Sequence, residues 1–134
     1  MTIRTAIFSD LEALAAHDHH ISRAELENLI SLGRVTVLDI DGELAGWLRW
    51  NLFWDNTPFL NLLFLLESHR GKGYGREMMA HWEARMAGLG YNQVMTSTAS
   101  DEYAQHFYRK LGYVAVGSFA PFGDPLELIF MKQF

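Results

Sequence analysis

The feature that most constrains the fold lies at mid-chain, where residues 70–75 read RGKGYG. The run at 59–66 before them is almost entirely apolar, and the stretch after them has apolar residues at helical spacing, so the segment joins a strand to a helix. Glycine lets backbone N–H groups approach a ligand closely, and the start of a helix attracts anions. The segment therefore predicts a phosphate-binding loop.

Two familiar phosphate loops do not fit this segment. A Walker A loop needs Ser or Thr after its lysine, but Lys72 is followed by Gly73. A dinucleotide-binding loop would have its third glycine at Arg76 and an acidic residue about 20 positions further on, where Thr96 and its neighbours stand. The loop must bind phosphates in another setting.

That setting resembles the GNAT superfamily of N-acetyltransferases, whose acetyl-CoA signature matches Arg70, Gly73 and Gly75. Residues 104–113, AQHFYRKLGY, resemble the family's Ala-x-x-Phe-Tyr-x-Lys-x-Gly-Phe segment. The resemblance covers nearly the whole chain. It implies an α/β fold of the GNAT type, with a mixed, mostly antiparallel central sheet, splayed strands and about four flanking helices. A single acetyltransferase domain would span residues 1–134.

The resemblance also implies direct transfer of an acetyl group from acetyl-CoA to a primary amine in a ternary complex. Tyr108 matches the tyrosine that serves many family members as general acid. Asp101 stands where the family often has Asn, and an acidic residue there would still cap the following helix. The cofactor-binding residues implied are Leu63, Phe64, Leu65, Arg70, Gly71, Lys72, Gly73, Tyr74, Gly75, Arg76 and Asp101.

Capping patterns and turn residues mark the elements before the loop. Ser9 and Ser22 each precede a glutamate by three residues, which predicts helices opened by capping boxes. Gly33 ends the second helix. Asp41-Gly42 between apolar stretches predicts a type I′ hairpin, and Pro58 predicts a second turn before the buried strand at 59–66.

Beyond the loop, we expect one helix, a strand at 93–97, a helix at 101–111 closed by Gly112, and strands at 113–116 and 126–132. The first of these helices carries an apolar stripe, which we expect in the core. The stripe is formed by Met78, Met79, Trp82, Met86 and Leu89.

Composition limits the functional classes. The net charge of −5 argues against nucleic acid as a partner, because phosphate contacts need a basic face. No apolar run is long enough to cross a membrane and the N-terminus is polar, so we expect a cytoplasmic protein without a membrane partner. The absence of cysteine excludes disulfides, thiolate zinc sites and a cysteine acyl-enzyme.

Aromatic residues crowd the stretch before the central strand. Alternation along a strand places Trp50 and Trp54 on one face and Trp47 and Phe53 on the other. We expect one set in the core and the other in an acceptor pocket, and we assign Trp50, Trp54 and Asn61 to substrate binding. Aromatic faces would suit a cationic amine.

The remaining polar candidates leave alternatives open. Glu67 lies close to the loop, and Asn61 and Asp55 flank the central strand, yet none is compelled to act as general base, and a water chain to backbone carbonyls would serve equally. Residues 17–20, HDHH, read better as a solvated connection between helices than as a metal site, because adjacent residues rarely converge on one ion.

Two questions about partners stay open. The acceptor is a small-molecule or peptide amine of unknown identity, and a homodimer through the final strand ending at Phe134 is an alternative to a monomer. A different function is a non-catalytic CoA-binding or protein-interaction module that keeps the phosphate loop but has lost acceptor chemistry. Turnover with an amine would separate the two.

Overall fold

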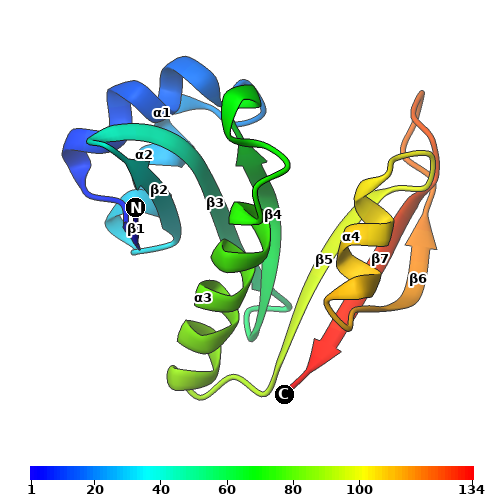
Figure 1. The fold of residues 1–134 in the computed structure, drawn as a ribbon. Coiled ribbons are helices and arrows are strands. Elements are labelled where there is room, and N and C mark those ends of the chain that lie inside the picture. The colour runs from blue at the N-terminus through cyan, green and yellow to red at the C-terminus, as the bar shows by residue number, and fades with distance from the viewer. The chain divides into compact units, whose positions relative to one another are not determined.

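The computed structural model describes all residues from Met1 to Phe134. Its internal contacts divide the chain into two compact units. The first unit comprises Met1–Asn51 and Leu62–Trp82, and the second comprises Leu52–Asn61 and Glu83–Phe134. The elements, with η for a 3-10 helix, are β1 (Thr2–Thr5), η1 (Phe8–Asp10), α1 (Leu11–His17), α2 (Arg23–Ser31), β2 (Val35–Ile40), β3 (Glu43–Phe53), β4 (Thr57–Leu65), η2 (Glu67–His69), α3 (Tyr74–Gly88), β5 (Gln93–Ala99), α4 (Ala104–Lys110), β6 (Val114–Phe119) and β7 (Glu127–Gln133) (Figure 1).

The seven strands form one sheet in the order β1-β2-β3-β4-β5-β7-β6. β4 and β5 run parallel, and their pairing covers Phe59 with Met95 and Leu60 with Thr96. The pairs β1–β2, β2–β3, β5–β7 and β6–β7 are antiparallel. The predicted class is confirmed as a mixed, mostly antiparallel sheet with four α-helices, whereas the single domain stays a prediction.

Two predicted turns in the first unit have the expected backbone. Asp41 and Gly42 have φ of 55° and 80°, as a type I′ hairpin requires at both positions. At the start of α2, the Oγ of Ser22 accepts a hydrogen bond from the backbone N–H of Glu25 at 3.1 Å. Gly33 follows the end of α2 with φ of 72°. The sequence-based expectations for the hairpin and for α2 are confirmed.

The core of the first unit lies between α1, α2 and one face of β2 and β3. Val37 pairs with Trp47, and directly paired residues share a face of the sheet. Leu38 and Leu48 on the other face are also fully buried, which explains the nearly continuous apolar run of these strands. The buried residues of the first cluster are Ala6, Leu11, Leu14, Leu26, Leu29, Ile30, Val35, Val37 and Trp47.

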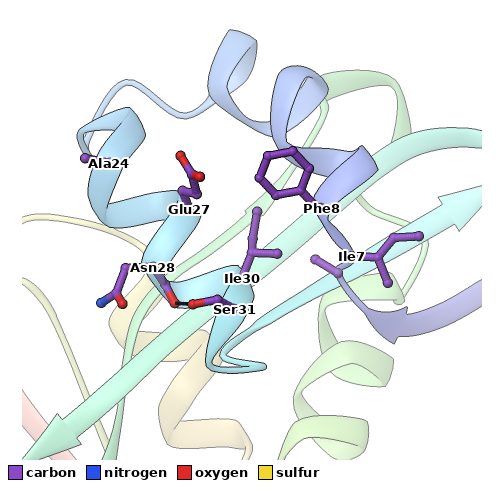
Figure 2. A pocket seen from close by; sticks show the side chains of 8 residues that line it. Ile7, Phe8, Ala24, Glu27, Asn28, Ile30 and Ser31 are labelled. Carbon is purple, nitrogen blue, oxygen red and sulfur yellow. Dashed lines mark hydrogen bonds between the residues drawn. The ribbon is translucent and has the colours of Figure 1, made fainter.

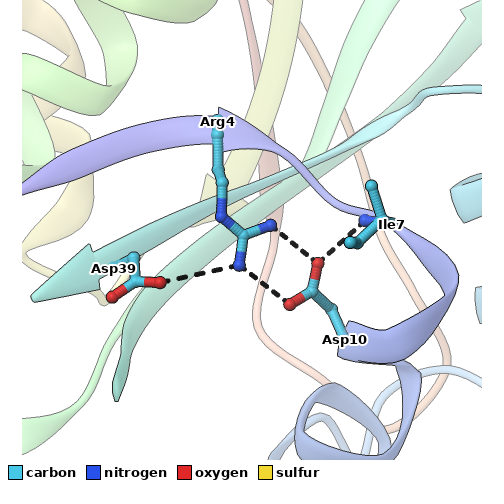
Figure 3. Close-up of polar contacts among 4 residues, drawn as sticks. All are labelled: Arg4, Ile7, Asp10 and Asp39. Carbon is cyan, nitrogen blue, oxygen red and sulfur yellow. Dashed lines mark hydrogen bonds and ion pairs between the residues drawn. The ribbon is translucent and has the colours of Figure 1, made fainter. Parts of the chain in front are cut away.

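An ion-pair cluster connects β1 to its neighbours (Figure 3). Arg4 donates to both oxygens of Asp10 at 2.8 and 2.9 Å, and its guanidinium lies 3.6 Å from Asp39 on β2. Asp10 also accepts from the backbone N–H of Ile7 at 2.8 Å. This arrangement forms η1 in front of α1, so the predicted capping box at Ser9 is wrong.

The turn between β3 and β4 comes earlier than predicted. β3 ends at Phe53, and Trp54 and Asp55 have positive φ of 54° and 62°. Pro58 already lies in β4 and is buried, so the predicted turn at Pro58 is wrong. Neither left-handed residue is glycine, and the turn residues Asp55 and Asn56 were a weaker signal than Pro58.

The second unit packs α4 against one face of the sheet formed by β5, β7 and β6. Phe130 of β7 is paired with Thr96 on one side and with Ala115 on the other. The ring of Tyr108 on α4 lies 6.5 Å from that of Phe130 and 5.6 Å from that of Tyr113. These three rings form the buried centre of the unit.

A polar cluster holds the last part of α3 against the same face. The carboxylate of Glu83 accepts from the hydroxyl of Tyr113 at 2.9 Å and from Nζ of Lys132 at 2.7 Å. Burial, together with the negative charge of Glu83, raises the pKa of Tyr113. The hydroxyl therefore stays protonated and continues to donate to the carboxylate.

Three details of the predicted C-terminal half are wrong. α4 is shorter than the expected helix at 101–111, and no side chain caps it, so Asp101 is not its cap. Leu89 follows the end of α3 and is 57% exposed, whereas the other residues of the predicted stripe are fully buried. The final strand, β7, lies between β5 and β6, so it is not a free edge for a homodimer.

Candidate functional site

The backbone of the predicted phosphate loop has the left-handed conformation that its glycines allow. Gly71 and Gly73 have φ of 73° and 86°. A Cβ built on either glycine would meet nothing within 4 Å, so the space beside the loop is open. The loop leads directly into α3, where the carbonyl of Gly73 accepts from Glu77 at 3.2 Å. The N–H groups of the first helical turn therefore have no acceptor within the helix.

The cations of the loop differ in their contacts. Arg70 turns back toward β4, because its Nε donates to the carbonyl oxygen of Leu65 at 2.9 Å. Its guanidinium also lies 5.1 Å from the ring centre of Phe64. Lys72 and Arg76 are exposed and form no ion pair, so their charges are uncompensated by any carboxylate. These two charges can stabilise an anion.

The end of β4 approaches β3 closely at a glycine that the sequence reasoning missed. A Cβ on Gly46 would lie 2.7 Å from Cδ2 of Leu65 and 2.8 Å from the carbonyl oxygen of Phe64. The backbone N–H of Leu66 donates to Ala45 at 2.9 Å in the same region. An isolated glycine inside a strand pattern is the signal that could have revealed this contact. Gly46 thus sets the position of the predicted pantetheine-binding residues of β4.

The connection between α1 and α2 is solvated at its three histidines, as predicted, but it is anchored by Asp18. Asp18 is 4% exposed, and its Oδ2 accepts from Nε of Arg49 at 2.8 Å and from the indole N–H of Trp47 at 3.1 Å. Burial alone would raise the pKa of the Asp18 carboxyl, but Arg49 and the hydrogen bonds from Trp47 and His20 lower the pKa overall. Asp18 therefore fixes the histidine-containing connection to β3.

No group of three or more His, Asp or Glu side chains is arranged to hold a metal ion. His17, His19 and His20 are exposed, and the ring of His17 lies 6.2 Å from that of Trp47. None of the helices is both long enough and apolar enough to span a membrane.

Tyr108 lies in the second unit and is 7% exposed. Burial raises the pKa of Tyr108 to about 12, and its hydrogen bond with Thr96 acts in the opposite direction. The hydroxyl of Thr96 donates to the carbonyl oxygen of Leu60 at 3.0 Å. Because its pKa is raised to about 12, the phenol of Tyr108 is neutral at physiological pH.

The predicted acceptor residues occupy three different environments. Trp50 is buried in the first unit, its indole N–H has no partner, and the guanidinium of Arg34 lies 5.3 Å from its ring centre. Trp54 is 80% exposed in the turn after β3, so strand alternation does not extend to it. Asn61 is exposed on β4. Their assignment to substrate binding stays a prediction.

One hollow in the first unit involves none of the predicted site residues (Figure 2). It has a volume of about 610 Å³ and lies between η1 and α2. Glu27 is its only ionisable side chain, and it contains no nucleophile other than the hydroxyl of Ser31, which donates to Asn28 at 2.7 Å. The side chains that line this hollow are therefore not suited to catalysing group transfer.

Comparisons with known proteins agree on one family. Residues 4–113 match the model of the family described as "Acetyltransferase (GNAT) family". No curated protein matches the chain significantly.

Solved structures similar to this chain include an acetyltransferase of the GNAT family from Bacillus cereus ATCC 10987, with 22% identity, a TM-score of 0.79 and coverage of 98% of this chain and 96% of that one. The ribosomal-protein-alanine N-acetyltransferase from Brucella melitensis has 21% identity, a TM-score of 0.82 and full coverage of both chains, 100%. The PaiA N-acetyltransferase from Thermoplasma acidophilum, solved in complex with coenzyme A, has 18% identity, a TM-score of 0.79 and coverage of 99% and 98%. These likenesses establish a shared fold.

Proposed function

Because the chain belongs to the acetyltransferase (GNAT) family, we propose that it transfers an acetyl group from acetyl-CoA directly to a primary amine. The observation that carries this proposal is the open loop of Gly71 and Gly73 at the start of α3. Left-handed glycines turn N–H groups toward the open side, and the helix adds its positive end. The similar PaiA enzyme was solved with coenzyme A, which has the phosphates such a loop would bind.

The residues present fit the cofactor. The free N–H groups of the first turn of α3 and the unpaired charges of Lys72 and Arg76 would hold the pyrophosphate. The backbone of Leu63, Phe64 and Leu65 would hold the pantetheine arm, with Arg70 fixing the end of that strand through Leu65. When bound, the cofactor would supply a thioester, which is an acetyl group activated for attack by an amine.

Tyr108 would serve as the general acid for the departing thiolate. A thiol has a pKa of about 8.5 in water, so a phenol with a raised pKa is a weak acid toward a solvated thiolate. The burial that raises the pKa of Tyr108 would act on a thiolate in the same surroundings too, since desolvation disfavours any anion. Both pKa values would rise together, which keeps the proton transfer feasible in a concerted step.

The amine must lose a proton before or during attack. A lysine-like amine with pKa of about 10.4 is mostly protonated at neutral pH. The ammonium would first lose one proton to water; as the neutral nitrogen bonds to the acetyl carbon and the carbon–sulfur bond breaks, a second N–H proton would leave to water and Tyr108 would give its proton to the sulfur. The phenolate is then reprotonated from solvent.

An amine-acceptor screen that measures free-thiol release from acetyl-CoA tests this function. A thermal-shift measurement with CoA alone comes first. We expect CoA to raise the melting temperature and at least one amine to give amine-dependent thiol release. An absence of any CoA-induced shift would reject the cofactor assignment.

A non-catalytic CoA-binding or protein-interaction module is the second candidate. The specific observation in its favour is that the Tyr108 hydroxyl already has Thr96 as a partner and that its ring packs among aromatic neighbours, as a purely structural tyrosine would. Stabilisation by CoA without turnover on any amine would support this module over the enzyme.

A further inference from the structure

The pairing register of the second unit identifies a sheet face that no helix of that unit covers. Residues paired across strands share a face, and alternate residues along a strand point to opposite faces. Phe130 and Lys132 face the helices, since Tyr108 and Arg109 of α4 contact Phe130 and Glu83 of α3 binds Lys132. The residues that alternate with them share the opposite face with their partners on β4, β5 and β6. They are Phe59, Met95, Met131 and Val114 in one row, Ser97, Ile129 and Gly117 in the next, and Ala99, Glu127 and Phe119 in the third.

This face, which we call the open face, is apolar over most of its area. Val114 and Phe119 are 64% and 53% exposed, whereas Ile129 and Met131 are partly buried. Apolar side chains left at the surface of a sheet favour contact with a nonpolar ligand group.

The carboxylate of Glu127 lies on the open face. The hydroxyl of Ser97 donates to Oε2 of Glu127 at 2.7 Å across the two strands. No lysine or arginine pairs with Glu127, and Oε1 has no hydrogen-bond donor. A partly buried carboxylate without a cation is a natural binding site for an ammonium group, which supplies three donors and the missing charge.

The carboxylate also lies beside the end of the parallel ladder. The last residue of β5 that pairs with β4 is Thr96, and Ser97 is the next residue in the strand. Thr96 in turn is the hydrogen-bond partner of Tyr108, the proposed acid. Ser97 follows Thr96 directly but points to the opposite face, so Glu127 and Tyr108 lie on opposite faces of the sheet near the end of this ladder.

We propose that Glu127, held by Ser97, binds the ammonium group of the acetyl acceptor before that group loses a proton to water and attacks, and that the apolar rows of the open face hold its substituent. This inference rests on the proposed function. The single carboxylate and the apolar surroundings select a primary monoamine with an aromatic or branched aliphatic group. A polyamine would bring further charges for which the open face has no partner.

Steady-state thiol release with 2-phenylethylamine as the probe tests the assignment. Glu127→Gln keeps the shape and removes the charge, and we expect its KM for 2-phenylethylamine to rise at least tenfold while the Kd for CoA stays within twofold. Glu127→Asp should recover part of the loss. Glu43→Gln is the matched control, because Glu43 is an exposed glutamate of the β2–β3 hairpin in the first unit, and its KM should equal that of the wild type. Spermidine should give a lower kcat/KM than 2-phenylethylamine.

Calorimetric titration of 2-phenylethylamine into the CoA-saturated protein separates the two proposals. Binding that Glu127→Gln abolishes, without thiol release, would support the amine site and reject catalysis. Thiol release with an amine at an unchanged KM in Glu127→Gln would support catalysis and overturn the amine site. Failure of 2-phenylethylamine both to bind and to react, in protein that does bind CoA, would also overturn it. The neutral analogue 2-phenylethanol should bind at least tenfold more weakly than the amine, and equal binding would contradict the role of charge.

Discussion

The phosphate loop and the surroundings of Tyr108 are built in different ways. The loop of the first unit depends on consecutive residues, since Gly71 and Gly73 take left-handed φ and α3 begins at the next position. The environment of Tyr108 in the second unit depends on residues far apart in sequence, because Thr96 and Phe130 meet it only through strand pairing and helix packing.

The difference teaches which part of a site local sequence can encode. The backbone of a short segment has only a few sterically allowed conformations, so the spacing of glycines predicts where a left-handed conformation occurs. A side-chain environment depends on register, and a shift of one residue would place every side chain on the other face. Substitutions can test whether the two kinds of site respond differently.

The largest effect is expected at a register-dependent feature of the first unit. Asp18→Asn removes the charge that pairs with buried Arg49, and breaking such a pair costs about 3–5 kcal/mol of unfolding free energy because the remaining charge is uncompensated. Urea unfolding measures the loss. Asp39→Asn is the control, since its ion pair with Arg4 is partly exposed and should contribute less than about 1 kcal/mol. Equal losses in the two variants would contradict the anchoring role of Asp18.

Tyr108→Phe should reduce kcat by about 100-fold or more, because it removes the general acid and keeps the ring packing. The Kd for CoA should stay within twofold of the wild type. Tyr103→Phe changes an exposed tyrosine beside the same helix and should leave kcat unaffected. An unchanged kcat in Tyr108→Phe would remove this residue from the mechanism and favour the binding module.

The free energy of unfolding at alkaline pH should show that Tyr108 is buried. Its folded pKa of about 12 lies above the unfolded value near 10, so the folded state keeps the proton longer. Stability is therefore retained below pH of about 10 and falls as pH rises toward about 12, by about 2 kcal/mol for this group. Urea unfolding at several pH values should show a smaller decline in Tyr108→Phe than in the wild type. Identical declines would contradict the buried position.

The smallest effect should come from the loop. Gly73→Ala places a Cβ in the open space and strains a left-handed backbone, so we expect the Kd for CoA to rise by about tenfold. Gly123→Ala is the matched control because Gly123 also has positive φ and open surroundings but lies between β6 and β7. It should lose similar stability and keep its CoA affinity. A loss of CoA affinity in both variants would show that strain, not contact, is responsible.

Local signals predicted much of the fold. The Asp41-Gly42 hairpin, the Ser22 cap and the position of the glycine loop between a strand and a helix were correct because each depends on a few adjacent residues. The turn at Trp54 and Asp55 was missed because Trp54 has no turn chemistry, and Pro58 is a stronger turn signal than the Asp55-Asn56 pair beside it.

The candidate site was predicted less completely than the fold. Nothing near Asp18 in the sequence indicates that Arg49 and Trp47 will surround it, because they lie about thirty residues away and meet it only in the folded unit. Glu127 and Ser97 likewise become neighbours through the register of β5 and β7. Such pairs require the strand order, in which β7 is inserted between β5 and β6, and chain order alone does not supply it.

The position of β7 has a consequence for how the protein is made. β6 is synthesised before β7 but has no strand partner until β7 has emerged and paired with it and with β5. During that interval the uncharged stretch VAVGSF and the adjacent edge of β5 would be open to intermolecular pairing. A chain truncated within the connection at 120–126 would thus keep both edges unpaired and should be prone to aggregate.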